Sequence, residues 1–119
     1  MKIEITQETK QETKQEKRLR ARCIEIVQYE CNPVTGEDLN FNEEVILEGL
    51  IKRDKGLKRS AYVRHDNDVY VEGEHIHEGK AVGDVRPAHW HVLLEFKNPV
   101  IVEGVANTFG VPMQYVEVK

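Results

Sequence analysis

The segment HWHVLLEFK, residues 89–97, constrains the fold more than any other stretch of this chain. Successive side chains of a β-strand point to opposite faces of the sheet. In this segment the alternation puts four large apolar side chains on one face: Trp90, Val92, Leu94 and Phe96. That face must be covered by helices, because so much apolar surface is not left in water. His89 and His91 therefore lie on the open face of a central strand.

The two histidines have the spacing of a pair of metal ligands. Their Cα atoms are two strand steps apart, roughly 6.6 Å, and two imidazoles that bind at about 2.1 Å can converge on one ion from there. A second pair in EHIHEG, His75 and His77, has the same spacing. It has no apolar continuation, and the glycines and acids around it are typical of a solvated loop. We therefore expect the metal at His89 and His91.

A third ligand is expected on a neighbouring strand. The segment VRHDND ends another predicted strand, so it brings His65, with Asp66 or Asp68, beside the pair if the two strands are adjacent. The other interpretation of HDND is an Asx-rich turn at a strand exit. Imidazole nitrogens with one carboxylate and open positions suit Mn²⁺ or Mg²⁺ bound near phosphates, ahead of Zn²⁺.

The order of elements predicts an α+β, ferredoxin-like fold. Strands are expected from Arg22, over 57–65, over 89–97 and over 112–119, with an irregular loop or loose hairpin at 67–86. A first helix follows Asn40 or Asn42 as its cap, and a second begins with Asn98 as cap and Pro99 in its first turn. This βαββαβ order gives an antiparallel sheet with both helices on one face. The metal site is expected on the other face.

The N-terminal 21 residues differ from the rest in composition. Residues 1–21 contain QETKQETKQEK and no apolar stripe, so they are expected to be a polar arm, disordered or marginally helical. Residues 22–119 form the predicted domain. No secretory signal or membrane span is evident, which predicts a cytoplasmic protein without a membrane partner. Cys23 and Cys31, without CxxC spacing, are expected to be free thiols.

The net charge of −4 hides a separation of signs along the chain. Basic residues gather at 10–22 and 52–64, and acidic residues outnumber basic ones between Asp66 and Asp84. Such a pattern can give one cationic face and one anionic pocket suited to a divalent cation. The alternative is an ordinary solvated surface.

Two of these segments together resemble a known family. RHDND followed by PAHWHVLLEFKNPV resembles the replication initiators of small Gram-positive rolling-circle plasmids, in the HUH endonuclease superfamily. The resemblance runs from about Arg22 to Lys119 and implies that His89, His91, His65 and Asp68 hold the metal. It implies nicking of single-stranded or hairpin DNA at a plasmid origin through a 5′-phosphotyrosine. We expect four cations to contact that DNA: Lys58, Arg59, Arg64 and Arg86.

The nucleophile of that family has no clear counterpart here. The family's tyrosine lies on a helix after the last predicted strand, which places it beyond Lys119. Tyr115 is the only tyrosine after the histidines, and its neighbours indicate a strand. The resemblance therefore predicts a nuclease domain without its catalytic helix, inactive alone and monomeric, whereas a longer form could oligomerise.

Two other functions fit parts of the sequence. GDVRPAHWHVLLE matches the first half of a cupin motif, in which Glu95 would be a ligand, but Glu95 is four strand steps from His91, roughly 13 Å. A ferredoxin-like module could instead bind nucleic acid without chemistry, and such modules stack bases on exposed aromatic side chains. DNA binding that is sensitive to salt but independent of metal would indicate such a module, whereas metal-dependent activity on DNA would indicate a nuclease.

Overall fold

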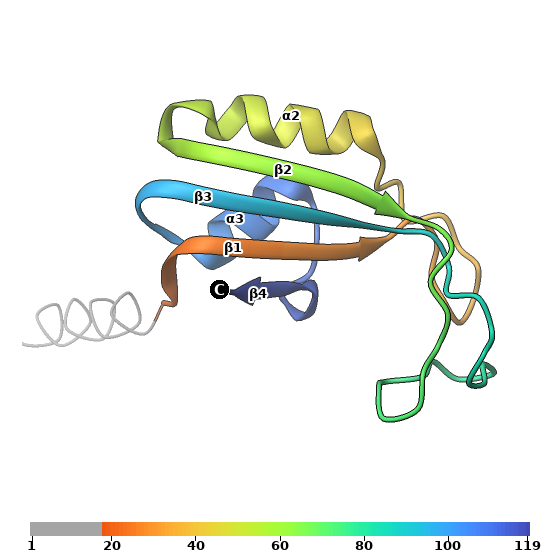
Figure 1. The fold of residues 1–119 in the computed structure, drawn as a ribbon. Helices are drawn as coiled ribbons and strands as arrows, with labels where there is room; N and C mark the ends of the chain where they lie inside the picture. Colours follow the sequence, from red (N-terminus) through yellow and green to blue (C-terminus); the bar gives the residue numbers. More distant parts are fainter. Residues whose placement is uncertain (1–17) are drawn as a thin grey trace, which may run out of the picture.

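The computed structural model describes residues 18–119 and shows one antiparallel sheet covered by helices on one face. In chain order the elements are β1 (Arg20–Tyr29), α2 (Glu43–Arg53), η1 (Asp54–Gly56), β2 (Leu57–His65), β3 (His89–Ile101), α3 (Val102–Phe109), η2 (Met113–Tyr115) and β4 (Val116–Val118). The strands lie in the order β2-β3-β1-β4, and every pairing is antiparallel (Figure 1). The predicted α+β, ferredoxin-like arrangement is confirmed.

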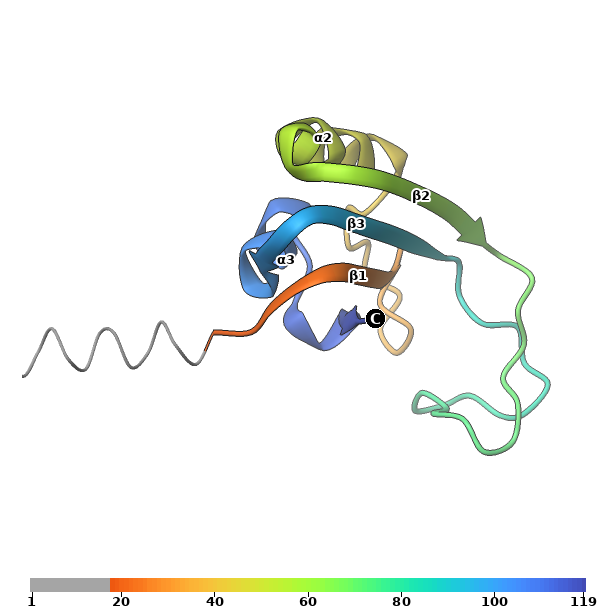
Figure 2. The same cartoon turned by 60° about the vertical axis from the view of Figure 1, so that its left-hand side comes forward.

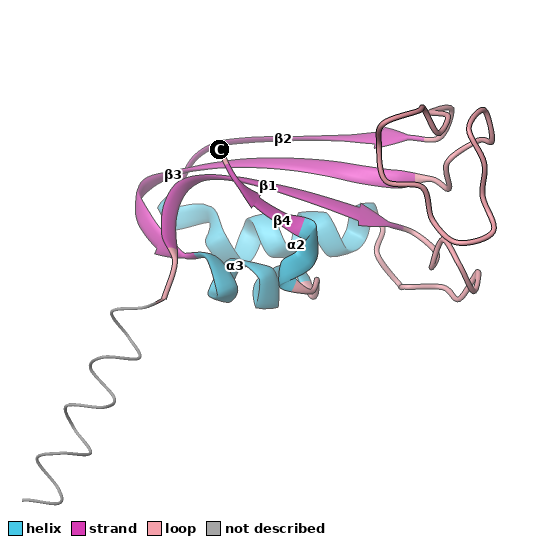
Figure 3. Ribbon diagram, turned by 90° about the horizontal axis from the view of Figure 1, so that it is seen from below, coloured by secondary structure: helices cyan, strands magenta, loops and turns pink. Residues whose placement is uncertain are grey.

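The helices lie together under the sheet, and the opposite face is open (Figure 3). Asn42 caps α2, since its side chain accepts a hydrogen bond from the Val45 N–H at 3.1 Å. Gly110 ends α3 in the left-handed conformation with φ 69°, as a glycine after a helix often does. The core lies between helices and sheet and includes the predicted stripe of β3: Trp90, Val92, Leu94 and Phe96.

Three predicted boundaries differ from the structure. The second helix does not begin at Asn98 and Pro99, because β3 continues through both residues to Ile101. The last strand is shorter than expected, because Met113–Tyr115 is a 3₁₀ turn and β4 starts at Val116. β1 starts at Arg20, two residues earlier than expected, and the rest of the predicted arm, 1–17, lies outside the described residues.

A long loop joins β2 to β3 and projects beyond the ends of the strands (Figure 2). It is a loose hairpin, closed by a bridge between Val69 and Val85 and by a 2.9 Å hydrogen bond from the Tyr70 N–H to the Asp84 carbonyl. The Tyr70 side chain is fully buried at its base. The loop therefore folds back on itself around Tyr70, at the end of the sheet where His65 and His89 lie.

Cys23 and Cys31 are free thiols, as expected. Within residues 18–119, no helix is long and apolar enough to cross a lipid bilayer.

Candidate metal centre

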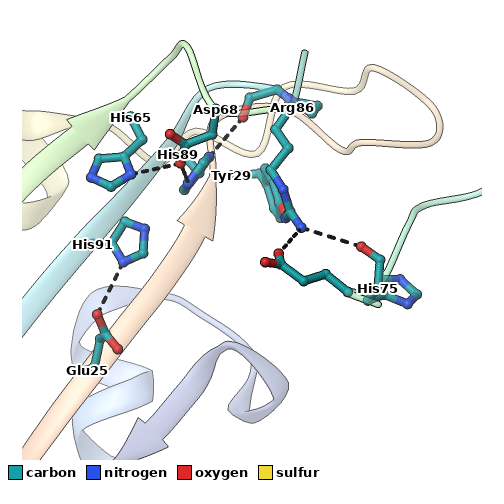
Figure 4. A network of polar contacts seen from close by, with 10 residues as sticks. Glu25, Tyr29, His65, Asp68, His75, Arg86, His89 and His91 are labelled. Carbon is teal, nitrogen blue, oxygen red and sulfur yellow. Dashed lines mark hydrogen bonds and ion pairs between the residues drawn. The ribbon is translucent and has the colours of Figure 1, made fainter. Parts of the chain in front are cut away.

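Three histidines from two adjacent strands meet on the open face of the sheet (Figure 4). His65 is the last residue of β2 and pairs in register with His89, the first residue of β3, while His91 pairs with Val63. One ring nitrogen from each of the three histidines lies within 4.8 Å of the others. The predicted adjacency of the two strands is therefore present, and it brings His65 to the predicted pair.

Each of the three imidazoles has a hydrogen-bond acceptor at Nδ1. His65 Nδ1 is 2.9 Å from Asp68 Oδ2, His89 Nδ1 is 3.0 Å from the Pro87 carbonyl oxygen, and His91 Nδ1 is 3.1 Å from Glu25 Oε2. A neutral imidazole carries one N–H, and an acceptor at Nδ1 places the hydrogen there. The Nε2 lone pairs are then free, which is the form in which a histidine binds a metal.

Asp68 lies between two of the histidines. Its Oδ2 accepts from His65 and is also 3.4 Å from His89 Nε2, so a carboxylate oxygen is next to a candidate ligand nitrogen. The hydrogen bond from His65 is the main reason that the pKa of the Asp68 carboxyl is lowered. Asp68 is therefore an anion beside the cluster, in a position to become a fourth ligand.

His89 is the most enclosed of the three histidines, with 4% of its surface exposed. The Tyr29 ring packs against it with a centroid distance of 5.3 Å, and His65 and His91 flank it at 5.3 and 5.2 Å. Burial is the main cause that lowers the pKa of His89. The imidazole is therefore kept neutral, and neutral imidazole is the metal-binding form.

Glu25 is a member of the site that the sequence analysis did not identify. It comes from β1 and contacts His91 across the sheet, 66 positions away in the chain. Burial works to raise the pKa of its carboxyl, but hydrogen bonds from Lys119 and His91 outweigh this, so the pKa is lowered. Only the pairing register of β1 and β3 could have revealed this contact.

The second histidine pair is outside the cluster. His75 and His77 lie in the loop with their ring centroids 4.9 Å apart, and His77 Nδ1 is 2.9 Å from the Tyr70 hydroxyl. Burial is the main cause that lowers the pKa of His77. In residues 18–119, the His65 cluster is the one group of three or more potential ligands close enough to share an ion.

The four cations predicted to contact DNA have different surroundings. Lys58 and Arg59 are exposed and both pair with Glu95, whose position on β3 faces the open side. Arg64 is on the helix side with Trp90 and pairs with Glu30 and Asp66. Arg86 is enclosed: it donates to Tyr29 Oη at 3.1 Å and to Glu74 at 3.0 Å, and stacks over the Tyr70 ring.

Tyr115 is near the site but separated from the histidines. It is the last residue of η2, and its ring centroid is 6.3 Å from that of Tyr29, which lies between it and His89. Glu95, the cupin-like ligand candidate, pairs with Arg59 instead of approaching the histidines. The open sheet with two helices on one face also excludes a cupin barrel for the described residues.

A comparison with known proteins shows similarity to part of a longer protein. The chain is 34% identical over 74 residues to a replication protein of Onion yellows phytoplasma (strain OY-M). The match covers 61% of this chain and 19% of that protein, so the chain spans about a fifth of the relative's length. No protein-family model and no solved structure matches the chain. The similarity thus relates this chain to a replication protein.

Proposed function

We propose that the chain is the metal-binding and DNA-positioning part of a replication initiator that nicks single-stranded DNA at a plasmid origin. The observation that carries the proposal is the group of three histidine nitrogens within 4.8 Å of one another on the open face of the sheet. The similarity to a replication protein supports a role in replication. The resemblance of the RHDND and HWH segments to HUH endonucleases supports the type of reaction.

The donor set fits a divalent transition-metal ion. His65, His89 and His91 would bind through Nε2, because their Nδ1 atoms already have acceptors, and Asp68 would add a carboxylate oxygen. Three imidazoles favour Mn²⁺ over Mg²⁺, which prefers oxygen ligands and keeps its water. When bound, such an ion polarises a phosphate and stabilises the charge that develops during its cleavage.

The open face beside the histidines offers room for a nucleotide strand. A shallow hollow of about 270 Å³ lies over β2, β3 and β1, and it begins at Leu93, two residues along β3 from His91. Apolar side chains such as Leu93 and Ala61 line it, and two cations, Arg59 and Lys119, also line it. A base can rest on apolar surface while a cation binds the phosphate next to it. We propose that the scissile phosphate reaches the histidines from this side.

The metal part of the proposal is tested by thermal unfolding with added Mn²⁺. Ligand binding to the native state raises the melting temperature, so Mn²⁺ should stabilise the chain. His89→Ala combined with His91→Ala should abolish the rise. The matched control is His75→Ala with His77→Ala, the second HxH pair, which should keep it. An equal rise in both double variants would refute the site.

The DNA part is tested with origin single-stranded DNA. Mn²⁺ should strengthen the binding of this DNA to the native chain. It should not strengthen DNA binding to the variant that combines His89→Ala with His91→Ala. A longer form of the chain should nick the strand in the same metal-dependent way, and this chain alone should not. Binding that falls with salt and ignores Mn²⁺ would favour a non-catalytic nucleic-acid-binding module instead.

A further inference from the structure

Of the three histidines, only His91 takes its Nδ1 partner from a distant part of the chain. His89 uses the Pro87 carbonyl two residues before it, and His65 uses Asp68 three residues after it. Both partners are therefore supplied by the local chain. His91 uses Glu25, which is on β1. The orientation of this imidazole consequently depends on a carboxylate from a neighbouring strand.

The sheet register brings Glu25 to this position. Val27 pairs with His91 and Glu25 pairs with Leu93, so Glu25 is the diagonal neighbour of His91 on the same face. Diagonal neighbours in an antiparallel pair are within reach of long side chains. Only 15% of the Glu25 side chain is exposed, so its contact with His91 is shielded from solvent.

The second oxygen of Glu25 is also occupied. Lys119 Nζ is 3.0 Å from Glu25 Oε1. The backbone N–H of Lys119 donates a hydrogen bond to the Cys23 carbonyl oxygen at 2.9 Å, which fixes this residue beside β1. The carboxylate is thus held between His91 on one side and Lys119 on the other. This arrangement restricts rotation of the carboxylate, so that Oε2 stays directed at His91 Nδ1 (Figure 4).

We infer that Glu25 is a positioning residue for the metal centre: it sets the His91 ring so that Nε2 faces the other two histidines. The inference rests on the proposed metal site. A carboxylate behind a histidine ligand fixes the tautomer and ring orientation, and its removal typically lowers metal affinity about 10- to 100-fold. Without Glu25, His91 could present either nitrogen to an ion.

The test compares Mn²⁺ affinity by isothermal titration in three variants of the full chain. Glu25→Ala should lower the affinity about 10- to 100-fold. Glu25→Gln should lower it less, because the amide oxygen can still accept from Nδ1–H although the charge is gone. The matched control is Glu117→Gln: Glu117 pairs with Glu25 in the sheet and also contacts Lys119, but within residues 18–119 it forms no hydrogen bond or ion pair with a histidine. This control should keep the native affinity.

A second measurement does not need the metal. The ¹⁵N chemical shifts of the His91 imidazole in the metal-free protein report which nitrogen carries the hydrogen. The native chain should show the Nδ1–H tautomer, and Glu25→Ala should show a mixture of tautomers. A merely structural role of Glu25 would lower the melting temperature and leave the tautomer unchanged.

The outcomes separate this inference from the proposed function. If His91→Ala weakens Mn²⁺ binding while Glu25→Ala binds Mn²⁺ and keeps the His91 tautomer like the native chain, the role of Glu25 is refuted and the metal site stands. If the native chain and the His89, His91 double variant bind Mn²⁺ equally, the proposed function fails, and the inference fails with it.

Discussion

Glu30 shows how a single carboxylate connects the ends of three strands. It follows β1, accepts from the Trp90 Nε1–H of β3 at 2.9 Å and from Arg64 of β2 at 2.8 and 2.9 Å. The hydrogen bond from Arg64 is the main reason that the pKa of Glu30 is lowered. Since these contacts lie at the end of the sheet where the histidines begin, Glu30 stabilises the base of the candidate site.

Glu30→Gln is therefore expected to destabilise the fold by about 1 to 2 kcal/mol at pH 7, the range for hydrogen bonds to a charged group that is not fully buried. The lowered pKa means that this stabilisation is present above the ordinary glutamate value of 4.5 and is lost as pH falls through the folded-state value. The gap in unfolding free energy between the native chain and the variant, measured with urea, should narrow below pH 4.5.

Glu48→Gln is the control for this prediction, because Glu48 is exposed on α2. The unfolding free energy of the Glu48→Gln variant should match that of the native chain at every pH. A gap for Glu30→Gln that stays constant from neutral to acidic pH would show that the charge of Glu30 does not contribute.

Residues of the site differed in how far the sequence alone could identify them. Strand alternation placed His89 and His91 on the open face because it depends only on neighbouring positions. The third histidine, His65, required the additional assumption that two strands are adjacent, which the structure bears out. Glu25 was missed, because a contact between residues 66 positions apart depends on a register that no local pattern encodes.

At the level of elements, the start of the second helix was mispredicted for a physical reason. Asn98 followed by Pro99 is a frequent helix start, but here both lie in an irregular part of β3, where the pairing with β1 shifts between Ala21 and Cys23. Proline lacks the N–H that a regular ladder needs, and a bulge tolerates that loss. The helix then begins at Val102, and four apolar residues at helical spacing are buried along it: Val102, Val105, Ala106 and Phe109.

The contact between the two helices depends on a glycine. A Cβ added at Gly49 of α2 would overlap the Phe109 ring of α3, which is itself buried in the core. Gly49→Ala should gain about 1 kcal/mol of helix propensity, but overpacking typically costs about 1 to 3 kcal/mol. We therefore expect a net destabilisation on the order of 1 kcal/mol in urea unfolding.

Gly104→Ala on α3 provides the matched comparison. Its added Cβ would meet Arg53 Nη2 at 3.3 Å, the far end of a flexible side chain that can move. The propensity gain should then dominate, and this variant should be as stable as the native chain or more so. If both alanine variants gained stability equally, close packing of Gly49 on Phe109 would not matter.

Across the whole molecule, opposite charges are gathered at opposite ends of the sheet. Basic residues surround the starts of β1 and β2, the end of β3 and the end of α2: Arg20, Arg22, Lys52, Arg53, Lys55, Lys58, Arg59 and Lys97. Acidic residues dominate the loop beside the histidines: Asp66, Asp68, Glu72, Glu74, Glu78 and Asp84. The sequence pattern suggested one cationic face and one anionic pocket. In the fold the two groups of charges lie instead toward opposite ends of the strands (Figure 1).

Under the proposed function, this direction predicts which cations would contact a nucleic acid strand on the open face. Lys58 and Arg59 are exposed there and share one carboxylate, Glu95, which they can exchange for phosphate. Arg64 and Arg86 are already committed to contacts on the helix side and in the loop. Lys58→Ala combined with Arg59→Ala should therefore weaken single-stranded DNA binding.

The change should appear in the salt dependence of that binding. For single strands each neutralised phosphate contributes about −0.7 to the slope of log affinity against log salt, so losing both cations should reduce the magnitude of the slope by about 1.4. Lys80→Ala is the control, because Lys80 lies in the acidic loop and should leave the slope unchanged. A strand placed on the open face should depend on Lys58 and Arg59 at one end of the sheet and not on Lys80 at the other. An equal reduction of the slope in Lys80→Ala would therefore show that DNA binding depends only on the net charge of the protein.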